Sequence, residues 1–114
     1  MKTLLIVMTM IISTTALAAN KDKSCNAYFK AATSNAKPQV RIELGLKAMA
    51  IAAELTLTPA QESKILANSL NFISQNPSKQ DDFEKMFQFA CTNDLDADEV
   101  EQLAAQLEQL ESMN

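Results

Sequence analysis

The sequence predicts an all-α protein, a single small domain of about five helices tied by one disulfide bond. Three observations lead to this fold class. The 114-residue chain has one glycine and no tryptophan, and it contains few β-branched runs. Alanine, leucine, glutamine, glutamate and lysine, which all favour helices, are frequent. Apolar residues recur at spacings of three and four, the period of a helix with one buried face.

The first 19 residues, MKTLLIVMTMIISTTALAA, have the pattern of a secretory signal peptide. A lysine precedes an apolar run from Leu4 to Ile12, and small residues follow it. The run is shorter than the roughly 20 residues that cross a bilayer. We therefore expect cleavage after Ala18 or Ala19, one domain over residues 20–114, and no membrane span after cleavage. A short signal of this kind is typical of export to a bacterial periplasm.

Export determines how the two cysteines are interpreted. Cys25 and Cys91 are the two cysteines of the chain. In an oxidising compartment a pair of cysteines in a small exported protein favours a disulfide. The sequence therefore predicts a Cys25–Cys91 bond, which makes both thiols unavailable as nucleophiles or metal ligands.

The first two helices are predicted from caps and periodicity. The first follows Ser24 and ends near Asn35, and the second opens after Pro38 and runs to about Leu55. The second is apolar on two sides, which is typical of a central, buried helix. Gly45 in its middle costs about 1 kcal/mol relative to alanine, and this predicts close approach of another helix. The residues expected to face inward are Cys25, Tyr28, Phe29 and Ala32 in the first helix, and the stripes Val40, Leu44, Ala48, Ile51, Leu55 and Ile42, Leu46, Met49, Ala53 in the second.

Three further helices are predicted to begin at caps. Thr58 caps the third, with Pro59 in the first helical position and Gln61 completing a capping box. Ser78 is expected to cap the fourth, which ends at Cys91, and Asp96 to cap the fifth. The inward stripes are Ile65, Leu66, Ser69, Leu70 and Ile73, then Phe83, Met86, Phe87 and Ala90, then Val100, Leu103, Leu107 and Leu110.

The composition argues against catalysis and nucleic-acid binding. The chain has no histidine, the commonest general base and metal ligand, and no glycine-rich loop that could hold a phosphate. Residues 20–114 carry nine basic and fourteen acidic residues, a charge of the wrong sign for a phosphate backbone. We therefore predict a non-enzymatic protein without catalytic, cofactor-binding or metal-binding residues and without a nucleic-acid partner.

Two short motifs are explained more simply by helix capping. The stretch LTPAQ matches the LTxxQ signature of Spy/CpxP-type chaperones, but a capping box accounts for the same residues. The stretch NDLDADEVE resembles the start of a calcium loop, but it lacks the glycine at the sixth position and the glutamate at the twelfth. Both are therefore interpreted as helix starts.

The charge is unevenly distributed along the chain. Residues 20–64 carry seven basic and four acidic residues, whereas residues 65–114 carry two basic and ten acidic ones. Without histidine, the charge changes mainly near pH 4, where carboxyl groups take up protons. We expect acid to expose apolar stripes of the second and third helices, including Ile51, Leu55, Leu66 and Leu70.

The stretch SCNAYF resembles the opening of the small periplasmic HdeA/HdeB acid-stress chaperones, and FACTND is similar to the second cysteine and tail of that family. Only Cys25 and Cys91 match residue by residue. The resemblance implies a helical domain with one disulfide, a homodimer at rest that opens in acid and holds unfolding periplasmic proteins.

A second resemblance points to another partner. The segment LNFISQNPSKQDDFEKMFQFAC is similar to the closing part of small helical immunity proteins that neutralise type VI secretion effectors. That resemblance implies tight binding of one effector. The sequence thus favours an acid-stress chaperone, with an immunity protein or an accessory component of an envelope assembly as alternatives.

Overall fold

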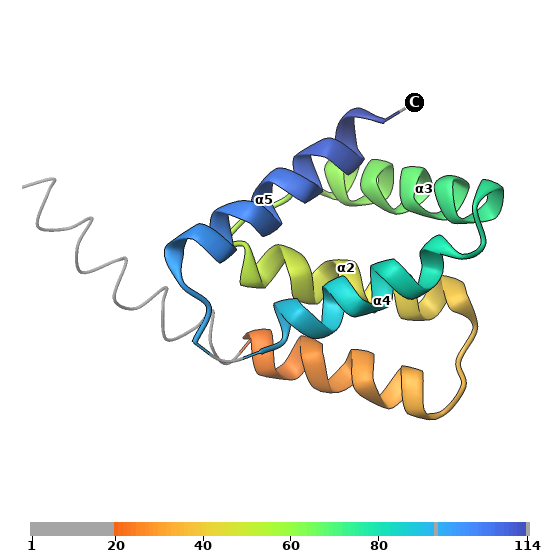
Figure 1. Cartoon of the computed structure of the whole chain (residues 1–114), viewed down its shortest axis with the longest axis horizontal. Coiled ribbons are helices and arrows are strands. Elements are labelled where there is room, and N and C mark those ends of the chain that lie inside the picture. Colours follow the sequence, from red (N-terminus) through yellow and green to blue (C-terminus); the bar gives the residue numbers. More distant parts are fainter. Residues whose placement is uncertain (1–19, 93, 114) are drawn as a thin grey trace, which may run out of the picture.

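All regular structure in the described residues, 20–92 and 94–113 of the computed structural model, is helical (Figure 1). This confirms the predicted all-α class, and the helices form one compact domain. The signal peptide predicted for residues 1–19 lies outside the described residues. The helices span residues 20–33 (the N-terminal helix), Pro38–Ala52 (α2), Pro59–Gln75 (α3), Lys79–Ala90 (α4) and Ala97–Ser112 (α5).

The N-terminal helix shows where local capping rules were wrong. Ser24, the predicted cap, lies inside the helix, which is already formed at Asn20. The Lys21 ammonium donates to the carbonyl oxygen of Thr92 at 2.8 Å. That hydrogen bond joins the first turn of the helix to the residue that follows the end of α4. Because the two residues are far apart in the sequence, no local motif predicts this contact. The predicted end of this helix near Asn35 is confirmed, because Asn35 has a φ of 62° and its left-handed backbone ends the helix.

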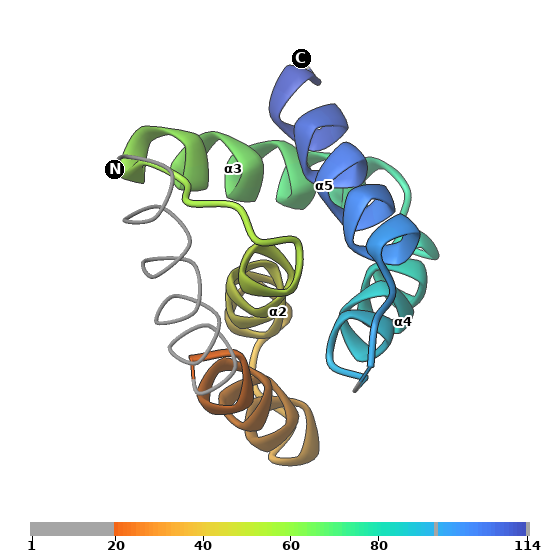
Figure 2. The ribbon, with the colours of Figure 1, turned by 90° about the vertical axis from the view of Figure 1, so that its left-hand side faces the viewer.

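Helix α2 lies in the middle of the molecule, between the N-terminal helix, α3 and α4 (Figure 2). Its central, buried position is confirmed, although it ends at Ala52 and not at Leu55. Glu54 adopts a φ of 58°, and the Leu55 amide donates to the carbonyl of Ala50 at 3.0 Å. This Schellman-type closure satisfies the last carbonyls of the helix and turns the chain away.

Gly45 lies where α2 and α4 pack closely against each other. A Cβ atom at this position would overlap the ring of Phe87, which comes from α4. Phe87 is fully buried, so its ring cannot swing into solvent to make room. The prediction that Gly45 admits another helix is confirmed, and the partner is α4.

The later helices begin as predicted except in one respect. In α3 the Gln61 amide donates to the Thr58 hydroxyl at 3.1 Å, and in α5 the Glu99 amide donates to the Asp96 carboxylate at 2.8 Å. Both capping boxes are complete. Ser78 occupies the cap position of α4, but its side chain makes no capping hydrogen bond. Instead, the Lys79 amide donates to the carbonyl of Asn76 at 2.9 Å, so the backbone of the preceding turn replaces the side-chain cap.

The core is formed where the helical stripes converge, but two predicted inward residues are exposed. Phe29 and Val40 are each 41% exposed. Ala31 is buried in the N-terminal helix instead, and the Phe29 ring lies against the edge of the core at 5.4 Å from the Tyr28 ring centroid. Periodicity defines a stripe but not how far the neighbouring helices extend along it. The most deeply buried large side chains are Tyr28, Ile42, Met49, Ile65, Phe87, Leu103 and Leu107.

No helix within the described ranges is both long enough and apolar enough to cross a bilayer.

Candidate functional site

The two predicted site residues, Cys25 and Cys91, are brought together and bonded. Their Cα atoms are 5.8 Å apart and the bond spans 66 positions of sequence. Cys25 lies on the N-terminal helix and Cys91 is the C-cap of α4, so the bond joins these two elements. The predicted disulfide is confirmed, and neither thiol is free to act as a nucleophile or a ligand.

Sequence reasoning missed a polar cluster that joins three helices. The Tyr28 hydroxyl of the N-terminal helix donates to Glu84 Oε1 on α4 at 3.0 Å. Arg41 on α2 lies beside the same oxygen, with its Nε atom at 3.9 Å, and Gln80 donates to the other carboxylate oxygen at 3.3 Å. The Arg41 and Glu84 side chains are each 18% exposed. We name Tyr28, Arg41, Gln80 and Glu84 the tyrosine cluster.

The tyrosine cluster strongly favours the neutral phenol. Burial raises the pKa of Tyr28 well above its ordinary value, and the hydrogen bond to Glu84 and the negative charge of that carboxylate add to the effect. The Arg41 charge opposes it only in part. A phenol that stays protonated suits a structural donor and not a general base. No local signal predicts this cluster, because Tyr28, Arg41 and Glu84 come from three different helices.

An apolar groove opens between the end of α3, α4 and the last turns of α5. Its volume is about 530 Å³, within the range of ligand-binding clefts. The Lys79–Asp82 ion pair, 3.5 Å long, lies at its rim, and the buried Oε1 atom of Gln106 in its wall has no hydrogen-bond partner. We call this surface the methionine groove, after its apolar lining of Phe72, Phe83, Met86, Leu110 and Met113.

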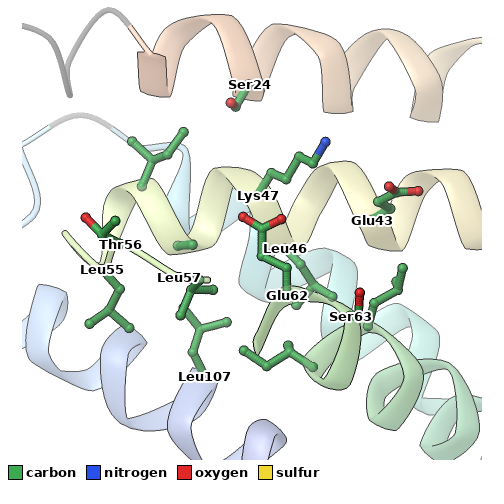
Figure 3. Close-up of a pocket in the computed structure, with 14 residues that line it drawn as sticks. Ser24, Glu43, Leu46, Lys47, Leu55, Thr56, Leu57, Glu62, Ser63 and Leu107 are labelled. Carbon is green, nitrogen blue, oxygen red and sulfur yellow. The ribbon is translucent and has the colours of Figure 1, made fainter. Parts of the chain in front are cut away.

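A second cavity, of about 420 Å³, lies between the N-terminal helix, α2 and α3 (Figure 3). Lys47 extends from α2 toward the N-terminal helix, and the Glu62 carboxylate points toward Lys47 from α3. Leu107 reaches the cavity from α5. We call it the α2–α3 pocket. Its apolar lining includes Leu46, Ile51, Leu55, Leu57, Leu66 and Leu107, and its polar residues are Ser24, Glu43, Lys47, Thr56, Glu62 and Ser63.

The spacing of apolar residues predicted which helix faces are apolar, but it did not predict that some of these faces line the methionine groove and the α2–α3 pocket. Met86 was predicted on the inward stripe of α4, and Ile51, Leu55 and Leu66 on those of α2 and α3. All four are half-buried and line an open cavity. The spacing of apolar residues shows which face of a helix is apolar. It does not show whether a neighbouring helix closes over that face.

The short motifs lie where capping predicts. Asp96 and Glu99, from the stretch that resembles a calcium loop, are engaged in the capping box of α5. Across residues 20–92 and 94–113 no group of three or more acidic, cysteine or histidine side chains is arranged to hold a metal ion. In LTPAQ, Thr58 and Gln61 form the capping box of α3.

No protein-family model, curated protein or solved structure matches this chain. The resemblances of SCNAYF and FACTND to acid-stress chaperones, and of the α3–α4 segment to immunity proteins, therefore stay predictions. They rest on the residues quoted above and on the disulfide that joins Cys25 to Cys91.

Proposed function

We propose that this protein is a non-enzymatic periplasmic chaperone that holds unfolding proteins during acid stress, and that client segments bind in the methionine groove. The lining of that groove carries the proposal. Two phenylalanines, two methionines and a leucine line this open groove, which has a volume of about 530 Å³. The disulfide supports function in an oxidising compartment such as the periplasm.

The chemistry of the methionine groove favours many clients over a single effector. Methionine is unbranched and polarizable, so Met86 and Met113 can adapt to apolar side chains of different shapes. Promiscuous binders use such surfaces, whereas a specific partner is better matched by a rigid, complementary one. Gln106 and Gln109 line the same groove, and their amides can pair with the backbone of an unfolded segment.

The tyrosine cluster supports a response to acid. Helix α4 carries Phe83 and Met86 of the groove, and its Glu84 is paired with Arg41 of α2. A carboxylate held by a cation stabilises the fold while it is charged. Carboxyl groups in general take up protons near pH 4. Loss of the contact between Arg41 and Glu84 would loosen the attachment of α4 to α2, which would widen the groove.

The remaining acidic residues contribute less to this response. Within the described residues, ion pairs are formed by Glu84 and by Asp82, and Asp82 is 61% exposed. An exposed pair such as Lys79–Asp82 contributes about 0–1 kcal/mol. Of these two ion pairs, the contact between Arg41 and Glu84 is therefore the one proposed to hold α4 against α2.

The main test measures suppression of client aggregation by light scattering from about pH 2 to about pH 7. We expect protection below about pH 4, and its loss in a Met86→Asp and Met113→Asp variant that stays folded. Val40→Asp is the matched control, because Val40 is apolar and 41% exposed but does not line the groove. Equal loss in the control would contradict binding in the methionine groove.

Glu84→Gln separates the acid response from client binding. The variant lacks the carboxylate charge at every pH, so dye binding to apolar surface should begin at a higher pH than in the parent. Glu101→Gln is the control, since Glu101 is exposed on α5. Absence of both dye binding and protection in acid, with the disulfide intact, would remove the acid-chaperone proposal. A tight complex with one secreted toxin at neutral pH would instead support immunity.

A further inference from the structure

We infer that the α2–α3 pocket binds a single-chain amphiphile with a phosphoethanolamine head, that is, a lysophospholipid. This site is separate from the methionine groove, so the inference stands or falls independently of the proposed function. It rests on the apolar floor of the pocket and on the three charges at its mouth.

The floor suits one aliphatic chain. The cavity of about 420 Å³ is lined by leucine and isoleucine side chains from α2, α3 and α5. Ile51, Leu55 and Leu66 are half-buried, so they still expose apolar surface that a ligand could cover. Each buried methylene of a chain contributes about 0.8 kcal/mol, so an aliphatic chain that covers these side chains would gain affinity from the apolar part of the lining.

The mouth carries charges of both signs. Glu43 and Lys47 lie one turn apart on α2, and Glu62 approaches Lys47 from α3 (Figure 3). All three side chains belong to exposed residues, and Lys47 forms no ion pair within 4 Å in the described part of the chain. An anionic head would meet two carboxylates, and a cationic head would meet the ammonium. A zwitterionic head can place its phosphate at Lys47 and its own ammonium at one of the two carboxylates, Glu43 or Glu62.

The lining also distinguishes between zwitterionic heads. A quaternary ammonium is bound in proteins mainly by aromatic faces. None of the 14 residues that line the pocket is aromatic. A primary ammonium can donate hydrogen bonds to carboxylates such as Glu43 and Glu62, which a quaternary ammonium cannot do. The pocket therefore favours an ethanolamine head over a choline head.

Calorimetric titration of the disulfide-bonded protein with monoacyl lipids below their micelle concentrations tests the inference. The probes share one acyl chain and carry phosphoethanolamine, phosphocholine or phosphoglycerol heads. We expect the phosphoethanolamine lipid to bind about tenfold more tightly than either of the others, the size of one charge-assisted contact. Equal affinity for all three heads, or no binding of the phosphoethanolamine lipid, would overturn the inference.

Two variants locate the site. Lys47→Glu should weaken binding of the phosphoethanolamine lipid about tenfold, while Lys64→Glu, the same change at an exposed residue of α3 outside the pocket, should leave it unchanged. Ile51→Asp should abolish binding by placing a charge on the apolar floor. If Ile51→Asp fails to fold, as circular dichroism would show, the Lys47 and Lys64 pair still decides the question. Equal effects of those two variants would contradict binding in this pocket.

Discussion

Tyr28 shows how one buried hydroxyl can connect three helices. Its ring is fully buried and lies against the Phe87 ring of α4, with the ring centroids 5.5 Å apart. Its hydroxyl reaches Glu84, which is also beside Arg41. The apolar body of the side chain packs in the core, while its polar tip ends in the tyrosine cluster.

The raised pKa of Tyr28 gives a prediction at alkaline pH. The phenol of the unfolded chain ionises near pH 10, but the folded protein keeps it protonated. Because the folded pKa is the higher one, its stabilisation is present below about pH 10 and is lost as the pH rises beyond it. Tyr28 is the one tyrosine of the chain, so near-ultraviolet absorbance of the phenolate reports on it alone. Native protein should ionise at clearly higher pH than protein in urea, and coincident titrations would contradict the prediction.

Gly45 gives a second prediction at this scale. In an open helix, Gly45→Ala would stabilise by about 1 kcal/mol through helix propensity. Here the new methyl group would overlap the buried Phe87 ring, and overpacking of this kind costs about 1–3 kcal/mol. We expect a net loss in the free energy of unfolding measured in urea. The loss should shrink when Gly45→Ala is introduced into a Phe87→Leu background, and a more stable single variant would show that the contact is not rigid.

At the scale of elements, the helix starts differ in what satisfies their first amides. The Thr58 hydroxyl and the Asp96 carboxylate accept hydrogen bonds from their own helices, whereas the Ser78 side chain makes no capping bond. A residue type that favours the cap position therefore does not always make the capping bond. Thr58 and Asp96 have the extended backbone conformation of a cap, whereas the backbone of Ser78 is already helical.

Thr58→Ala should lower the free energy of unfolding by about 1 kcal/mol, because it removes the acceptor of the Gln61 amide. Ser78→Ala, the matched control, should change stability by less. Client protection should be unchanged in a folded Thr58→Ala or Gln61→Ala variant, since LTPAQ serves as a cap. Loss of protection in either folded variant would show that this motif takes part in binding. Urea unfolding and the aggregation assay measure the two effects separately.

At the scale of the whole molecule, the disulfide joins the N-terminal helix to the end of α4 across 66 positions of sequence. A loop of that length removes unfolded-state entropy equivalent to about 4 kcal/mol in the chain-entropy model. The bond also leaves α5 outside the closed loop. Helix α5 is held by the packing of side chains such as Leu103 and Leu107, and by the Asn68 side-chain amide of α3, which donates to the Leu110 carbonyl at 2.7 Å.

A variant with Cys25→Ser and Cys91→Ser should be less stable by a few kcal/mol in urea unfolding. The loss should be smaller than the chain-entropy value if the reduced chain keeps residual structure. Intact mass after alkylation without reductant checks the bond itself in the parent protein. Two alkylated thiols in that experiment would rule out the bond in solution.

The sequence by itself determined the fold class, most of the helix bounds and the pairing of Cys25 with Cys91. These features depend on local chemistry, on caps such as Thr58 and Asp96 and on apolar spacing, or on the presence of one cysteine pair. The position of α2 at the centre followed from its two apolar sides. The role of Gly45 followed from its unfavourable place inside a helix.

Only the tertiary structure decided which apolar faces stay open and which polar groups meet. The stripes of α2, α3 and α4 look alike in sequence, yet Met49 and Phe87 are fully buried while Ile51 and Met86 line open cavities. Likewise, Tyr28 and Glu84 are 56 positions apart and meet only when the N-terminal helix packs beside α4. The helical period predicts the direction in which a side chain points. Whether that side chain is buried depends on where the neighbouring helices end.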